Sequence, residues 1–308
     1  MELFIPLFMT ILTALTIIIY DRYMKEAGRD DTKLRLTPDN ASEFYQATTE
    51  QYWAAKEELE KHECEELTVR NGKVLLYGKL YRTKENNDKV ILAVHGYHSG
   101  GMFDMGRFHK LYEELGYDYL IISQRAHEKS GGKYISFGHH EKEDGLCWIG
   151  KILEMYPDNV QIVLHGVSMG AATVLLMAGS EKLPEQVKRV IADSSYTSMK
   201  DQMDHMSRDH SQFYRDVTQG MFDFCSRLLA KYSLADTSAL EAAKKARIPG
   251  LIIHGEDDDY VPVEDARRLY EAYGGRHQIL VVPGAGHARS YVVNPDLYDR
   301  KVKAFMEW

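Results

Sequence analysis

The chain has 308 residues, a net charge of −8, and a composition that is 44% hydrophobic, 11% aromatic and 27% charged. This is a globular profile, which excludes a disordered chain, a collagen and a polytopic membrane protein as descriptions of the whole molecule. Acidic residues outnumber basic ones by 46 to 38, so no nucleic-acid partner is predicted. The 3 cysteines are widely spaced and predict neither a disulfide framework nor a zinc site.

The chain begins with an apolar segment. Residues 3–20 carry no charge, and as a helix they would extend roughly 27 Å, close to the thickness of a hydrocarbon core. Residues 1–20 are therefore predicted to be a retained single-pass membrane anchor; a helix packed against protein and a cleaved signal are the alternatives. Arg22, Lys25 and Arg29 follow the segment and predict that the rest of the chain lies on the cytoplasmic side.

Residues 21–64 are predicted to form a linker and one helix. Residues 21–39 are polar and charged, whereas 40–62 have apolar residues at helical spacing behind a possible cap at Asp39 or Asn40. The period changes near residue 65, where two alternating segments flank Asn71-Gly72. Such a dipeptide between two strand-like segments predicts a β-hairpin.

Strand and helix patterns then alternate to the end of the chain. The expected strands are 90–94, 119–122, 160–164, 188–192, 251–253 and 278–282, and the expected helices between and after them are 104–115, 140–156, 169–180, 262–273 and 295–308. This alternation predicts an α/β domain over 65–308, with a mostly parallel sheet covered by helices on both faces. The interval 196–247 lacks a strand pattern and is predicted to be a helical cap insertion.

The strongest local motif is H-G-V-S-M-G at residues 165–170, between a predicted strand and a predicted helix. Gly166-x-Ser168-x-Gly170 at such a junction is a nucleophile elbow, in which the glycines allow a tight turn that exposes the serine hydroxyl. The helix that begins at Met169 directs its free N–H groups toward the same point. Ser168 is therefore the predicted nucleophile.

A serine nucleophile needs a base and an acid that orients the base. Both occur downstream, in L-I-I-H-G-E-D-D-D-Y-V-P (251–262) and L-V-V-P-G-A-G-H-A (280–288). Each motif follows a predicted strand, and the carboxyl ends of parallel strands meet at one edge of a sheet. His287 is the predicted base. Asp257, Asp258, Asp259 and Asp193 are the candidate acids.

The same edge receives the loop A-V-H-G-Y-H-S-G-G at residues 93–101. A second backbone donor for a developing oxyanion is expected from this loop. The predicted oxyanion hole consists of the N–H groups of Tyr97 and Met169.

Together these motifs resemble the α/β-hydrolase superfamily, in its bacterial carboxylesterase-like and serine-aminopeptidase-like branch. The resemblance extends over about residues 65–308 and implies that the acid is Asp258, at the matching position of H-G-x-x-D-x-x-V-P. One segment departs from it. Where relatives usually have D-x-R-G-x-G-x-S, residues 123–130 are S-Q-R-A-H-E-K-S, which keep Arg125 and Ser130 but lack both glycines and the aspartate.

The predicted activity is hydrolysis of small-molecule carboxylic esters through an acyl-enzyme, with no metal and no organic cofactor. The alternatives are a serine peptidase acting on short peptides, an acyltransferase or thioesterase, and a non-catalytic membrane-tethered binding protein. The cap is expected to supply apolar side chains to an acyl pocket. The candidates for this pocket are Met199, Met203, Met206, Phe213, Tyr214, Met221, Phe222 and Phe224.

Overall fold

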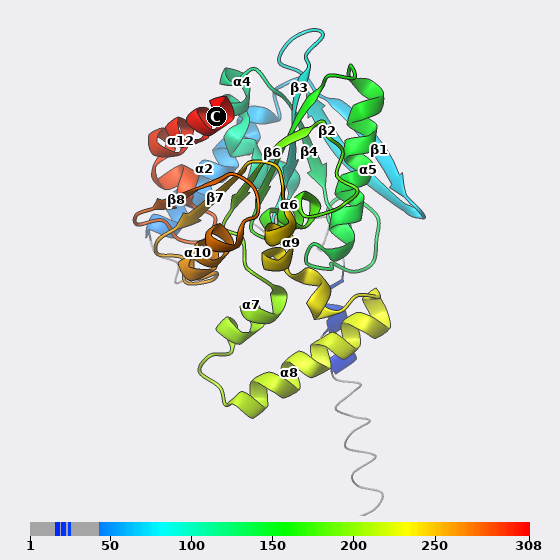
Figure 1. The fold of residues 1–308 in the computed structure, drawn as a ribbon, viewed down its shortest axis with the longest axis vertical. Coiled ribbons are helices and arrows are strands. Elements are labelled where there is room, and N and C mark those ends of the chain that lie inside the picture. Colours follow the sequence, from blue (N-terminus) through cyan, green and yellow to red (C-terminus); the bar gives the residue numbers. More distant parts are fainter. Residues whose placement is uncertain (1–15, 19, 23, 26–42) are drawn as a thin grey trace, which may run out of the picture.

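The computed structural model describes residues 16–18, 20–22, 24–25 and 43–308. Its centre is an eight-stranded sheet in the order β1-β2-β4-β3-β5-β6-β7-β8 (Figure 1). The pairs β1·β2 and β2·β4 are antiparallel, and every pair from β4 across to β8 is parallel. The strands are β1 (Glu65–Asn71), β2 (Val74–Tyr81), β3 (Lys89–Val94), β4 (Asp118–Ser123), β5 (Gln161–Val167), β6 (Val187–Asp193), β7 (Gly250–Gly255) and β8 (His277–Val282).

Helices cover both faces of this sheet. Those of the main domain are α2 (Glu43–Leu59), α3 (Gly101–Met105), η2 (Gly106–Phe108), α4 (His109–Glu114), α5 (His139–Met155), α6 (Met169–Ala178), α9 (Ala239–Lys245), α10 (Val263–Ala272), α11 (Ser290–Val293) and α12 (Pro295–Glu307). One core lies against α5, α6, α9 and α10, and the other against α2, α3, α4 and α12. The predicted α/β-hydrolase fold is confirmed, with residues 104–115 split into three short helices rather than one.

The central strands are buried because they supply side chains to both cores. In β3, Val90, Leu92 and Val94 face one core, whereas Ile91 and Ala93 face the other. This is the two-residue period of a strand that is covered on both faces. The chain passes from β3 to β4 on one side and later to β5 on the other. The carboxyl ends of β3 and β5 therefore flank the crevice in which doubly wound folds place their ligands.

The interval between β6 and β7 is helical, as its sequence pattern predicts. It contains α7 (Met199–Met206), α8 (Gln212–Cys225), the π-helical turn η3 (Ser226–Ala230) and η4 (Leu234–Thr237), followed by α9. Figure 1 shows α7 and α8 set apart from the sheet at one end of the molecule. We refer to residues 196–237 as the cap.

The predicted membrane anchor over residues 1–20, with a cytoplasmic catalytic domain, is contradicted. Within the residues that the structure describes, no helix is both long enough and apolar enough to cross a membrane. Residues 1–15 and 19 of this segment lie outside the described residues. The described part of the segment contacts protein instead: Tyr20 and Met24 are buried, and the Tyr20 ring lies 5.1 Å from Phe222 and 5.9 Å from Tyr134. Tyr20 and Met24 thus pack on the domain and the cap, whereas Ile18 is exposed.

Candidate active site

Ser168 occupies a strained turn between β5 and α6. Its backbone has φ 54° and ψ −117°, a conformation that a non-glycine residue rarely adopts. The flanking glycines are sterically required, because a Cβ on Gly166 would lie 2.2 Å from the Gly170 carbonyl oxygen and one on Gly170 would lie 2.1 Å from that of Val94. The turn is fixed by the Ser168 N–H, which donates to the Asp193 carbonyl at 2.8 Å.

Ser168, His287 and Asp258 form one hydrogen-bonded chain. The Ser168 Oγ lies 2.9 Å from His287 Nε2, and His287 Nδ1 lies 2.8 Å from Asp258 Oδ2. The three residues come from the ends of β5, β7 and β8, which are far apart in the sequence. An N–H on Nδ1 that donates to the carboxylate leaves Nε2 free to accept the serine proton.

Asp258 is surrounded by donors. Its Oδ1 accepts the backbone N–H groups of Tyr260 at 3.0 Å and Val261 at 2.8 Å, and His254 Nε2 lies 3.2 Å from Oδ2. Burial alone would raise the pKa of Asp258. Hydrogen bonds from His254 and His287 outweigh it and hold the pKa well below the usual range of a carboxyl. The carboxylate therefore stays ionised beside His287.

The other candidate acids face elsewhere. Asp257 and Asp259 are exposed, although they flank Asp258 in the chain. Asp193 is buried, but its carboxylate meets the hydroxyl groups of Ser194 and Tyr298. Burial raises the pKa of Asp193 despite the nearby Arg107. Of the four candidates, Asp258 is the one hydrogen-bonded to His287.

The loop after β3, residues 95–100, packs directly against Ser168. A Cβ built on Gly96 would lie only 3.4 Å from the Ser168 Cβ. The Gly96 N–H donates to Asp104 Oδ2 at 2.7 Å, which anchors the loop to α3. Tyr97 follows Gly96 in this loop, and Met169 is the first residue of α6. The structure thus brings both predicted oxyanion donors to the edge of the sheet that holds Ser168.

Ala288, the residue after His287, holds the loop that carries His287 in place. Ala288 has a positive φ of 58°, and its N–H donates to Ser194 Oγ at 3.2 Å. Its carbonyl accepts the hydroxyl of Tyr52 and an N–H of Arg107. Arg107 also donates to the Asp104 carbonyl at 2.6 Å and stacks on Tyr52 at 4.3 Å. One buried guanidinium therefore links the His287 loop to the anchor of loop 95–100.

These supporting residues were not predicted from the sequence. Tyr52 lies within the helix predicted over 40–62, whose spacing gives it no role beyond packing, and Asp104 and Arg107 lie in a segment without a motif. His254 belongs to the quoted H-G-E-D-D-D motif, which is the one signal that could have identified it.

One aromatic contact and one hydrogen bond connect the cap to the residues around Ser168. Phe222 of α8 lies 6.2 Å from Phe137, whose ring lies 5.4 Å from that of Tyr97. On the other side, Gln202 of α7 donates to the Tyr260 carbonyl at 2.6 Å, and the Tyr260 ring lies 4.9 Å from His287. The cap therefore reaches loop 95–100 through Phe137 and contacts the loop after β7 at Tyr260.

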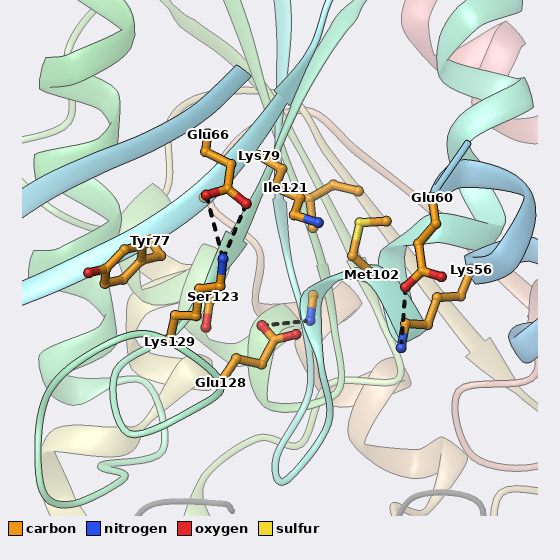
Figure 2. Close-up of a pocket in the computed structure, with 12 residues that line it drawn as sticks. Lys56, Glu60, Glu66, Tyr77, Lys79, Met102, Ile121, Ser123, Glu128 and Lys129 are labelled. Carbon is orange, nitrogen blue, oxygen red and sulfur yellow. Dashed lines mark hydrogen bonds and ion pairs between the residues drawn. The ribbon is translucent and has the colours of Figure 1, made fainter. Parts of the chain in front are cut away.

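A cavity of about 250 Å³ opens beside α3, between the β1–β2 hairpin and α2. Figure 2 shows its lysine and glutamate side chains, with Lys129 bonded to Glu66 at 3.2 Å and Glu128 accepting the Gly101 N–H. Lys56 and Glu60 pair at 3.6 Å on the opposite wall. Because these charges pair with one another, the cavity does not present a field of one sign.

Comparison with known proteins places these observations in a family. A sequence model described as the alpha/beta hydrolase family matches residues 91–300. The uncharacterized protein YqkD of Bacillus subtilis (strain 168) is 31% identical over 222 residues, which cover 71% of each chain. A bifunctional esterase/perhydrolase of Acinetobacter calcoaceticus is 26% identical over 151 residues, 40% of this chain and 52% of that protein.

Among solved structures, an esterase of Pyrococcus furiosus superposes with a TM-score of 0.63. The match covers 80% of this chain and 91% of the esterase, at 22% identity. At this identity the likeness shows a shared fold.

Proposed function

The chain belongs to the alpha/beta hydrolase family, and from this premise we propose that it is a serine hydrolase that cleaves carboxylic esters through an acyl-enzyme. Ser168 is the nucleophile, His287 the base and Asp258 the acid that orients the base. The observation that carries the proposal is the hydrogen-bonded chain of 2.9 Å and 2.8 Å that joins their side chains.

The reaction has two halves. In the first, Ser168 Oγ attacks the ester carbonyl carbon while its proton passes to His287 Nε2. The imidazolium that forms is stabilised by the Asp258 carboxylate, and it then returns the proton to the leaving alcohol as the C–O bond breaks. In the second half, water attacks the acyl-serine by the same route and releases the carboxylic acid and Ser168. No step needs a cofactor.

The tetrahedral intermediate of each half places a negative charge on the former carbonyl oxygen. We assign its stabilisation to the N–H groups of Tyr97 and Met169, and the dipole of α6 adds to the effect because Met169 opens that helix. Loss of one such donor typically costs about 3–4 kcal/mol of transition-state stabilisation. The fixed geometry of loop 95–100 supports this assignment.

We assign an apolar acyl group to the side chains that join the cap to loop 95–100. Phe222, Phe137 and Tyr97 form a row of rings there, and the partly buried Met203 packs against the same core. Methionine and aromatic groups adapt to irregular apolar ligands. The names of the esterase relatives support the ester class. A serine peptidase would use the same three residues.

The test uses two measurements on the full chain. Wild type should be labelled by a fluorophosphonate and should hydrolyse p-nitrophenyl esters faster than aminoacyl-p-nitroanilides. Ser168→Ala should lose labelling and all but a trace of turnover with an unchanged circular dichroism spectrum. Labelling without ester hydrolysis, together with anilide cleavage, would indicate a peptidase. An active Ser168→Ala enzyme would refute the assignment of the nucleophile.

A further inference from the structure

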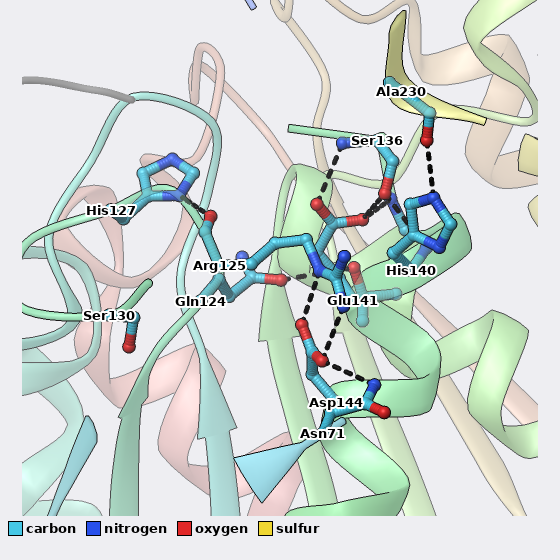
Figure 3. Close-up of polar contacts among 12 residues, drawn as sticks. Asn71, Gln124, Arg125, His127, Ser130, Ser136, His140, Glu141, Asp144 and Ala230 are labelled. Atoms are coloured by element: carbon cyan, nitrogen blue, oxygen red, sulfur yellow. Dashed lines mark hydrogen bonds and ion pairs between the residues drawn. The ribbon is translucent and has the colours of Figure 1, made fainter. Parts of the chain in front are cut away.

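The segment that departs from the family pattern forms a compact loop beside the candidate site. We call residues 124–130 the support loop; it follows β4 and precedes α5 (Figure 3). Gln124 and His127 are buried, and Ala126 and Glu128 adopt positive φ angles of 58° and 46°. Ser130 closes the loop by donating its hydroxyl to the Ser123 carbonyl at 2.6 Å. Such a contorted backbone indicates that the surroundings dictate its shape.

The support loop and loop 95–100 exchange hydrogen bonds through two histidine rings. His127 Nε2 accepts the N–H of His98 at 3.1 Å, and in return His95 Nε2 accepts the N–H of Gln124 at 3.0 Å. The two rings meet edge to face at 4.8 Å. His127 Nδ1 donates to the Arg125 carbonyl at 2.8 Å, as Figure 3 shows, and this bond fixes the orientation of the ring.

These contacts require His127 to be neutral, because its Nε2 acts as an acceptor. Burial, with a smaller effect from the neighbouring His95, lowers the pKa of His127 well below that of a free histidine. The loop that carries Arg125 is itself anchored, because the guanidinium forms two bonds of 2.6 Å with Asp144 of α5. The acceptor offered to His98 is thus rigid.

The amides on both sides of Tyr97 are therefore committed. The preceding N–H, of Gly96, goes to Asp104, and the following one, of His98, goes to His127. Farther along, the Gly101 N–H donates to Glu128 of the support loop at 3.2 Å (Figure 2). These bonds fix the peptide planes before and after the Gly96–Tyr97 peptide, and the carbonyl of that peptide accepts a hydrogen bond from His95 Nδ1 at 2.8 Å. Together they hold the direction of the Tyr97 N–H.

We propose that His127 is a positioning residue of the oxyanion hole, acting through the His98 amide to aim the Tyr97 N–H at the developing charge. The proposal rests on the proposed function and adds to it a residue that does not touch the substrate. Donor geometry matters most in the transition state, where a displacement of about 1 Å can cost on the order of 100-fold in rate. Ground-state binding depends on it much less.

The experiment compares His127→Leu, which removes the acceptor, with His127→Gln, whose carbonyl oxygen can reach the place of Nε2. On p-nitrophenyl acetate the leucine variant should lose about 10–100-fold in kcat with KM within threefold of wild type. The glutamine variant should recover most of this loss. Affinity for a boronic acid that mimics the tetrahedral intermediate should fall with kcat in the leucine variant. If the leucine variant fails to fold, His127→Asn replaces it, because the asparagine side chain is too short to accept the His98 N–H. The same loss in kcat is then expected.

The matched control is His109→Leu. His109 is another buried histidine, but its ring bonds to the Gly106 carbonyl and lies against His62 at 5.3 Å, so kcat should not change. A wild-type enzyme without ester hydrolysis or fluorophosphonate labelling would refute the proposed function and this role with it. The role of His127 alone would be refuted if wild type is active and the leucine variant keeps kcat within twofold. A leucine variant that changes only KM would refute it as well.

Discussion

At the residue scale, the chemistry of Asp258 follows from the donors that face it. Two backbone N–H groups and two histidine nitrogens surround one carboxylate. Hydrogen bonds to the charged form favour that form, which is why the pKa lies below its usual value despite burial. His254 has no other role in the proposed reaction. Its Nε2 lies 3.2 Å from Asp258 Oδ2, the same oxygen that His287 contacts, and His254 is best described as a positioning residue.

Asparagine substitutions at the candidate acids should separate their roles. Asp258→Asn should lower kcat by several orders of magnitude, on the order of the 10⁴-fold known for such a change in a serine triad, because the amide no longer selects the right imidazole tautomer. Asp257→Asn should stay within twofold of wild type, since Asp257 is exposed. Steady-state kinetics on one ester at pH 7 suffices.

Asp193→Asn is the more demanding comparison. Asp193 is buried like Asp258, and its backbone carbonyl accepts the N–H of Ser168. Its carboxylate does not bond to His287, so we expect less than a tenfold loss in kcat. A loss as large as that of Asp258→Asn would contradict the assignment of the acid.

At the scale of elements, α2 contributes to the site although it precedes the matched residues 91–300. Its Tyr52 hydroxyl donates to the Ala288 carbonyl, beside His287. One turn earlier, the hydroxyl groups of Thr48 and Thr49 accept hydrogen bonds from the guanidinium of Arg289. The helix thus orders the backbone on the carboxyl side of His287 from 236 residues away.

The cap offers a matched pair of phenylalanines on one helix. Phe222 packs toward Phe137 and Tyr20, whereas Phe224 is 53% exposed. Phe222→Ala should therefore shift the preference among p-nitrophenyl esters of increasing chain length, because it changes the wall that we assign to the acyl group. It should leave acetate hydrolysis within threefold of wild type. The ratio of kcat/KM for octanoate to that for acetate is the measurement.

Phe224→Ala is the control for this prediction. It removes the same side chain from the same helix at a solvent-exposed position, so the octanoate-to-acetate ratio should match that of wild type. Equal ratios for all three proteins would contradict an acyl pocket beneath α8.

At the scale of the whole molecule, the sequence was sufficient for the features that repeat. Buried strands and helices follow each other with clear periods, so the parallel sheet could be predicted. Ser168 and His287 could be placed together because each follows a strand of that sheet. Contacts between loops could not be predicted: the bond between His98 and His127 depends on a backbone N–H of one loop meeting a ring nitrogen of another at 3.1 Å, and no local pattern encodes that approach.

In the N-terminal segment a clear sequence pattern was present, but the prediction drawn from it was wrong. A run of uncharged residues describes a surface that avoids water, but it does not say whether lipid or protein covers it. Tyr20 and Met24 are buried against the protein. The hydroxyl of Tyr134 reaches Asp21 at 2.8 Å, so a polar contact accompanies the apolar ones. The membrane prediction failed because hydropathy carries no information about which partner a helix finds.

The stability of the whole molecule should decline in acid because His165 is buried in its neutral form. Burial, and to a smaller extent the charge of Arg107, lowers the pKa of His165 to about 3. Its Nδ1 accepts the hydroxyl of Tyr112 at 2.7 Å, while Nε2 donates to the Tyr298 oxygen at 3.1 Å. A second proton would bind at Nδ1, where it would face the Tyr112 hydroxyl that now donates to that nitrogen. The charged ring would also be buried away from water.

The direction of this pH dependence follows from proton linkage. The unfolded chain binds a proton at His165 below about pH 6.5, but the folded protein does so only near pH 3, so stability is fully present above 6.5 and falls as the pH drops between these values. The slope from this residue reaches about 1.4 kcal/mol per pH unit. His165→Gln, which does not titrate, should lower the free energy of unfolding at pH 7 but show a shallower decline toward pH 4. Urea unfolding across that range measures both, with the exposed His210→Gln expected to parallel wild type. Parallel curves for wild type and His165→Gln would mean that His165 takes up its proton in the folded state as readily as in the unfolded one.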